Sequence, residues 1–196
     1  MHRSSRDNMR AFRTKYLEAR TNEPLYILDL GSLDVNGSYR DLFAVPPWRY
    51  CGVDLAAGQN VDLVLRDPYC WREIPSNSVD VLISGQAFEH IEFFWLTMLE
   101  IGRVLKPEGI CCLIAPSSGF EHRHPVDCWR FYPDGFAALA RFASLTVAEV
   151  YRRQGTTAPE DEADLWRDTV LVCRKPAASK WASWKRSFRH YLLRRI

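Results

Sequence analysis

Histidine and carboxylate side chains gather in two short segments of this sequence. Glu89 and His90 are adjacent, and residues 121–130 read EHRHPVDCWR. An imidazole titrates near neutral pH, so it serves as a general base or as a metal ligand, and a neighbouring carboxylate can orient it. This mixture is unusual for a simple connector and predicts a site where an acceptor molecule loses a proton.

The candidate side chains divide by chemistry. The candidate catalytic residues are His90, His122, His124 and Asp127, and the candidate acceptor contacts are Glu89, Trp129 and Arg130. A flat indole beside imidazoles and a carboxylate suits a sugar, and it also suits a phenol. The alternative is a solvated loop in which Asp127 pairs with Arg130, while Glu89 favours a helix start and His90 only packs.

These residues need elements that bring them together, and apolar periodicity predicts such elements. We expect strands at 25–30, 49–55, 61–65, 79–85 and 109–116, helices at 8–20, 88–106 and 133–143, and a closing antiparallel pair at 145–153 and 168–174. Strands that alternate with helices predict a parallel sheet covered on both faces. Ligands of such sheets bind at the carboxyl ends of the strands.

The loop after the first expected strand has the composition of a nucleoside-binding turn. Gly31 permits a positive φ, and Asp54 ends the second strand 23 residues later, where a carboxylate suits a ribose diol. The loop has only two glycines, Gly31 and Gly37, and Asp34 between them would repel a pyrophosphate. This pattern favours S-adenosylmethionine (SAM) over a dinucleotide.

Four sequence segments together carry a family resemblance. ILDLGSLDVNGS, YCGVDL, SVDVLISGQAFEHI and EIGRVLKPEGICCLIAPS, within about residues 25–116, resemble the motifs of class I SAM-dependent methyltransferases. The segment HRHPVDCWRFYPDG resembles small bacterial methyltransferases of glycan and secondary-metabolite pathways. The resemblance implies an α/β, Rossmann-like three-layer sandwich with a seven-stranded mixed sheet, an antiparallel last strand and strand order 3-2-1-4-5-7-6.

The resemblance also implies roles for matching positions. Asp29, Gly31, Ser32 and Gly37 would surround the methionine part of SAM, Asp54 would hold the ribose, Leu55 and Asp67 would contact adenine, and Ser84, Gly85 and Gln86 would lie beside the methyl group. One departure is the missing third glycine of the first motif, where Val35 and Asn36 stand instead.

A divalent metal is not expected. Some O-methyltransferases of this class carry an E-x-x-E-H motif that binds a cation, but here the first glutamate is replaced by Gln86, a neutral and poorer ligand. The alternative is a site made by Glu89, His90 and either His122 or His124, which would supply carboxylate and imidazole ligands.

Charge is unevenly distributed along the 196 residues. The net charge is +2, but residues 1–20 carry +4 and residues 174–196 carry +8, which leaves −10 on the segment between them. An acidic body argues against nucleic acid as a partner, because RNA affinity depends on phosphate neutralisation. An RNA methyltransferase is therefore the less favoured alternative.

The ends of the chain and its cysteines bear on location. Residues 1–176 are expected to form the methyltransferase domain, and residues 177–196 a basic amphipathic helix. Through residues 179–196 this helix suits contact with the inner face of a membrane or docking on a partner subunit. The first 20 residues do not resemble a secretory signal, and the six cysteines include no CxxC pair. These features predict a cytoplasmic protein without disulfides.

Together these observations predict SAM-dependent methyl transfer, with S-adenosylhomocysteine as product. The expected acceptor is an oxygen atom of a sugar, a glycan or a similar small polar molecule. The alternative from a different class is a non-catalytic SAM-binding domain that its basic tail recruits to a membrane or a partner. Neither the oligomeric state nor the acceptor follows from the sequence.

Overall fold

The computed structural model describes residues 3–152 and 165–177. Its helices are α1 (Arg3–Leu17), η1 (Glu18–Arg20), α2 (Arg40–Phe43), η2 (Phe88–His90), α3 (Phe94–Val104) and α4 (Pro133–Phe142). Its strands are β1 (Tyr26–Leu30), β2 (Arg49–Asp54), β3 (Leu63–Val64), β4 (Val79–Gly85), β5 (Leu105–Ala115), β6 (Thr146–Arg152) and β7 (Thr169–Arg174).

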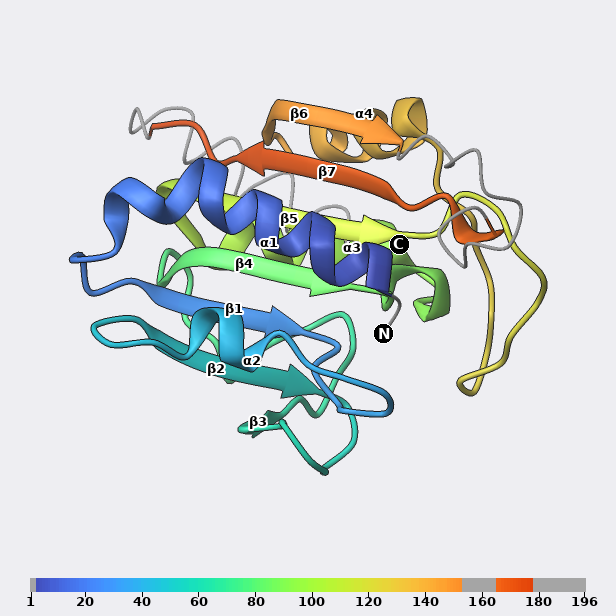
Figure 1. Cartoon of the computed structure of the whole chain (residues 1–196), viewed down its shortest axis with the longest axis horizontal. Helices are drawn as coiled ribbons and strands as arrows, with labels where there is room; N and C mark the ends of the chain where they lie inside the picture. Colours follow the sequence, from blue (N-terminus) through green and yellow to red (C-terminus); the bar gives the residue numbers. More distant parts are fainter. Residues whose placement is uncertain (1–2, 153–164, 178–196) are drawn as a thin grey trace.

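The strands form one mixed sheet whose order confirms the expected topology. The order is β3-β2-β1-β4-β5-β7-β6, and β1 to β5 pair in parallel. β7 lies between β5 and β6 and runs antiparallel to both (Figure 1). The carboxyl ends of the five parallel strands therefore meet at one edge of the sheet.

Apolar side chains cover both faces of this sheet because successive residues of a strand point to opposite faces. One face packs with Met9 of α1 and Phe43 of α2, and the other packs with Met98 of α3 and Phe136 of α4. Figure 1 shows α1 crossing one face and α3 and α4 on the other. The result is the expected three-layer α/β sandwich.

Several element boundaries differ from the expectation, and two of these differences have a clear physical reason. The helix expected over 88–106 is divided, because Ile91 adopts an extended conformation that separates η2 from α3, and Leu105 already pairs with Val79 in the sheet. The first helix begins at Arg3 rather than at residue 8, because Ser4 donates to Asp168 (2.7 Å). Such tertiary partners leave no mark in apolar periodicity.

All six cysteines are free thiols, as the sequence predicts. Cys111 of β5 faces Cys173 of β7 across the sheet, and burial raises the pKa of the Cys111 thiol well above its ordinary value. These thiols therefore act as small apolar side chains of the core.

The basic segment expected at 177–196 lies outside the described residues from position 178 onward. Within the described part of the chain, no helix combines the length and the apolar character needed to cross a membrane.

Candidate functional site

A cavity of about 560 Å³ opens at the carboxyl ends of β1, β2 and β4. Its size is within the range of small-molecule sites. Eight of the ten residues assigned to the cofactor line it: Asp29, Gly31, Ser32, Gly37, Asp54, Leu55, Gly85 and Gln86. The structure thus brings together residues from three strand ends that are far apart in the sequence.

Gly31 gives the turn after β1 its shape. Its φ is +75°, and a Cβ added there would lie 2.5 Å from the Cβ of Ala87. Its N–H and that of Ser32 both donate to the carbonyl of Val53 (2.9 and 3.1 Å). A side chain at position 31 would therefore strain the backbone and close the space between the β1 and β4 loops.

Asp54 is held in place at the end of β2 by backbone donors. One carboxylate oxygen accepts hydrogen bonds from the N–H groups of Leu55 (2.7 Å) and Ala56 (3.2 Å), and the other from Leu33 (3.1 Å). The carboxylate lines the cavity in a fixed orientation. Such a preorganised acceptor suits a pair of hydroxyl groups.

Asp29 lines the cavity as a buried side chain and accepts a hydrogen bond from the hydroxyl of Tyr50. Burial raises the pKa of its carboxyl to about 7. The hydroxyl of Tyr50 also accepts from Asn60 (3.2 Å), whose amide donates to the carbonyl of Ser32 (2.7 Å). Motif spacing did not reveal Tyr50 and Asn60, because their role depends on contacts between β2, the loop before β3 and the glycine turn.

Two residues assigned to the cofactor lie outside the cavity lining. Ser84 is buried and its hydroxyl donates to the carbonyl of Leu30 (2.8 Å), which ties β4 to β1. The carboxylate of Asp67 accepts from the N–H of Tyr69 (2.7 Å), while the neighbouring Pro68 lines the cavity. Asp67 thus shapes the turn that places Pro68.

The other wall of the cavity carries three histidines. His90 comes from η2, and His122 and His124 come from the loop after β5. The ring of His90 is 5.0 Å from that of His122 and 6.1 Å from that of His124, and the last two are 6.0 Å apart. Three imidazoles assigned as candidate bases are therefore brought to one place.

The environment of His90 and His122, the two less exposed of these histidines, favours the neutral form of each imidazole. The Nδ1 atom of His90 lies 2.5 Å from the carbonyl oxygen of Val126, which fixes that nitrogen as the donor and leaves Nε2 free. Burial lowers the pKa of His90 and of His122 below the ordinary value. A neutral imidazole can accept a proton or bind a metal ion.

Asp127 and Arg130 hold the histidine loop rather than line the cavity. Arg130 binds both oxygens of Asp127 (2.5 and 2.7 Å), and this pairing lowers the pKa of the Asp127 carboxyl. Asp127 also accepts from the backbone N–H of His122 (2.7 Å) and lies 3.2 Å from its Nδ1. The acid therefore orients His122 and pairs with Arg130 at once.

Trp129 also lies outside the cavity lining. Its indole N–H donates to the carbonyl of Glu92 (3.1 Å), and its rings pack on Phe94 and Trp95 with centroids 5.2 and 6.4 Å away. These contacts are with α3 and the turn before it, and the stacking role expected for this indole stays a prediction.

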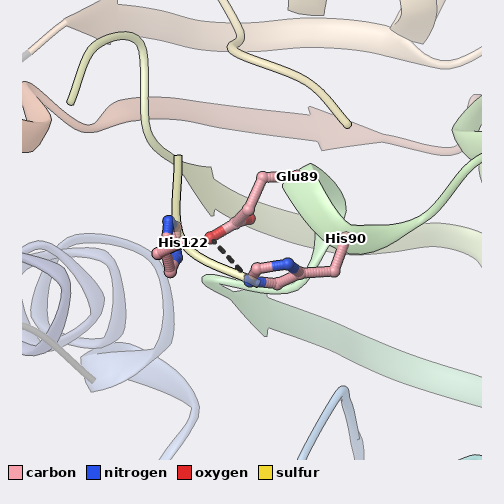
Figure 2. Close-up of side chains that lie close together, drawn as sticks. All are labelled: Glu89, His90 and His122. Carbon is pink, nitrogen blue, oxygen red and sulfur yellow. Dashed lines mark ion pairs between the residues drawn. The ribbon is translucent and has the colours of Figure 1, made fainter. Parts of the chain in front are cut away.

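Glu89 is completely buried behind the histidines, although it was expected to contact the acceptor. Neither of its carboxylate oxygens has a hydrogen-bond partner, and burial raises the pKa of the carboxyl to about 8. Its Oε1 lies 3.8 Å from Nε2 of His90 (Figure 2). One ligand atom each from Glu89, His90 and His122 lies within 4.8 Å of the others.

Comparisons with known proteins agree with this geometry. The family model described as a methyltransferase domain matches residues 28–113, which run from β1 into β5. A comparison with the curated proteins finds no match.

Several solved structures share the fold. The CurJ carbon methyltransferase superposes with a TM-score of 0.67 at 14% identity, over 88% of this chain and 54% of that one, so this chain spans about half of its length. A SAM-dependent methyltransferase from Archaeoglobus fulgidus gives 0.62 at 14% identity, over 87% and 95%. The 1,6-didemethyltoxoflavin-N1-methyltransferase of Burkholderia thailandensis, solved with 1,6-didemethyltoxoflavin and S-adenosylhomocysteine, gives 0.63 at 18%, over 88% and 84%.

The family match covers the glycine turn, Asp54 and the carboxyl ends of β1, β2 and β4, and the likeness to solved structures extends the same fold to most of the chain. Residues 28–113 therefore match the methyltransferase-domain family, and the chain has the fold of class I SAM-dependent methyltransferases.

Proposed function

We propose that this protein transfers a methyl group from SAM to an oxygen atom of a small polar acceptor, with a sugar as the leading class. One observation supports this most directly. A single cavity holds the glycine turn and Asp54 on one side and three histidines on the other. Oxygen acceptors need a base, because a hydroxyl group is a weak nucleophile until its proton is removed.

The residues present fit SAM on grounds internal to the structure. Bound SAM supplies an electrophilic methyl group on a positively charged sulfonium. The acidic side chains of Asp29 and Asp54 suit a cationic ligand with an amino group and a ribose diol, and the loop has no phosphate-binding glycine pattern. A Cβ at Gly85 would lie 2.0 Å from the hydroxyl of Tyr39, so the cavity wall at this point requires a glycine.

The histidine wall would bind the acceptor and take up its proton. His124 is exposed and lines the cavity, so it is the imidazole most open to an entering hydroxyl. His122 is backed by Asp127, whose carboxylate would stabilise a protonated ring. Holding the hydroxyl oxygen and the methyl donor in one cavity makes their encounter effectively intramolecular.

The first experiment is calorimetric titration of the full chain with SAM, S-adenosylhomocysteine and NAD. We expect binding of the first two and none of NAD. The second is a methyl-transfer assay over sugars, phenols and amines, read by mass spectrometry of the products. Transfer only to amine nitrogen would overturn the assignment of oxygen, and SAM binding with no product from any acceptor would favour a non-catalytic domain.

A further inference from the structure

We infer that Glu89, His90 and His122 form a binding site for a divalent transition-metal ion at the inner wall of the cavity. The three residues come from η2 and from the loop after β5, and one ligand atom of each lies within 4.8 Å of the others (Figure 2). Glu89 and His90 are adjacent, but 31 residues lie between His90 and His122. The cluster is therefore assembled by the fold and not by local sequence.

The strongest support is the state of the Glu89 carboxylate. The side chain is 0% exposed, and both oxygens are buried without a hydrogen-bond donor. A buried carboxyl group without a partner can avoid an unpaired charge only by keeping its proton, and a bound metal ion would let it ionise. Its Oε1 is directed at Nε2 of His90, 3.8 Å away, which is too far for a hydrogen bond.

The spacing fits one shared ion better than direct contacts. Ligands that bind one ion at about 2.1 Å lie roughly 3 to 4 Å apart, so the 3.8 Å between Glu89 and His90 suits a common ion. The ligand atom of His122 lies within 4.8 Å of the other two. Nδ1 of His122 lies 3.2 Å from Asp127 and makes no hydrogen bond there, so this nitrogen has a carboxylate beside it and no partner yet.

Each histidine also has the outer support that metal-binding imidazoles have. Metal-binding histidines commonly direct their second ring nitrogen to a carbonyl or a carboxylate. The carbonyl of Val126 occupies Nδ1 of His90, and Asp127 stands beside Nδ1 of His122. Nε2 of His90 thus stays available to an ion. Arg130, which acts electrostatically on Glu89, is paired with Asp127.

The ligand set selects the kind of ion. Two imidazoles and one carboxylate suit Zn²⁺ and neighbouring first-row ions, whereas Mg²⁺ favours oxygen ligands alone. Three protein ligands leave at least one coordination position open. His90 and His122 line the cavity, so the open position faces it.

This placement deepens the proposed function and rests on it for its chemical role. A hydroxyl oxygen of the acceptor bound at the open position would lose its proton more readily, as water does on zinc. The His124 imidazole would take up that proton, the oxygen would form the bond to the methyl carbon of SAM, and the sulfur would keep the electron pair of the broken S–C bond. No oxidant or reductant is needed.

The test is metal titration of the full chain after treatment with a chelator. We expect one Zn²⁺ per chain by calorimetry and one Co²⁺ by its visible absorption. Glu89→Gln, His90→Ala and His122→Ala should each abolish stoichiometric binding, and Asp127→Asn should weaken it roughly 10- to 100-fold because it removes outer support. Glu92→Gln and Cys128→Ser remove exposed potential ligands outside the cluster, and both should bind as the parent does.

Thermal unfolding and SAM calorimetry on each variant separate lost binding from lost folding. If Glu89→Gln does not fold, His90→Asn and His122→Gln replace it in the test. Both histidines are only partly buried, so these substitutions should disturb folding less. Stoichiometric binding that survives these substitutions, or no binding of Zn²⁺ and Co²⁺, would overturn the metal site. SAM binding without metal binding would overturn this inference alone, and metal binding without SAM binding would overturn only the proposed function.

Discussion

Single residues in this protein act through how firmly their neighbours hold them. Asp54 accepts hydrogen bonds from three backbone N–H groups, and Asp127 is clamped by Arg130. Such carboxylates cannot turn away, so they present the same oxygens before and after a ligand binds. By contrast, the described contacts of His124 are with the rings of His90 and His122 and include no aspartate or buried carbonyl. A ring without such a fixed partner suits proton exchange.

Replacement of Asp54 tests the cofactor side of the cavity. Asp54→Ala should weaken SAM and S-adenosylhomocysteine binding by about 10- to 100-fold, because a charge-assisted hydrogen bond contributes about 1.5–3 kcal/mol. Calorimetry provides the measurement. Asp67→Ala should cost less, because that carboxylate faces the N–H of Tyr69. Equal losses for the two variants would contradict this placement of Asp67.

Replacement of His124 tests the acceptor side. His124→Ala should lower kcat by roughly 10²- to 10⁴-fold, which is the usual contribution of a general base, while SAM binding stays unchanged. Steady-state kinetics with an accepted substrate and SAM calorimetry measure the two effects. A variant that retains full turnover would remove His124 from the reaction.

The elements of the fold were largely predictable because each strand is a short apolar run and each parallel crossover is right-handed. Residues such as Asp29 and Asp54 could be placed at strand ends from the same pattern. The division of 88–106 at Ile91, and with it the burial of Glu89, could not be predicted. The apolar spacing of that segment also fits one continuous helix, and only packing against the histidine loop decides between the two.

A matched pair of glycines tests the loop after β1. Gly31→Ala should destabilise the fold by roughly 1–3 kcal/mol and weaken SAM binding, because φ is +75° and the new Cβ would meet Ala87 at 2.5 Å. Gly135→Ala in α4 has open space around its Cβ and should stabilise by about 0.5–1 kcal/mol. Urea unfolding of both variants measures these changes, and a destabilised Gly135→Ala would contradict the helix assignment.

The fold buries an ionisable side chain, that of Asp29, in a central strand of the sheet. Asp29 lies in β1, between β2 and β4, where the sheet is covered by helices on both faces. Burial raises the pKa of its carboxyl from 3.8 to about 7, so the folded chain binds a proton that the unfolded chain releases. The stability that this proton provides is complete below about pH 4 and is lost as the pH rises to about 7.

Asp29→Asn isolates this contribution, because asparagine stays neutral at every pH. The free energy of unfolding of the parent, relative to Asp29→Asn, should fall by up to about 1.4 kcal/mol per pH unit between pH 5 and 7. Urea unfolding at several pH values gives both curves, and acidic groups elsewhere cancel in the difference. Parallel curves would show that Asp29 is ionised in the folded protein.

The position of β7 in the sheet has a consequence for synthesis of the chain. β7 is the last described strand in the sequence, yet it occupies the space between β5 and β6. Until Thr169–Arg174 leaves the ribosome, both of those neighbours present unpaired edges, and unpaired edges promote association between chains. A nascent chain that stalls before this strand should therefore need a chaperone to prevent association through these edges, although most of the cavity-lining residues have already emerged.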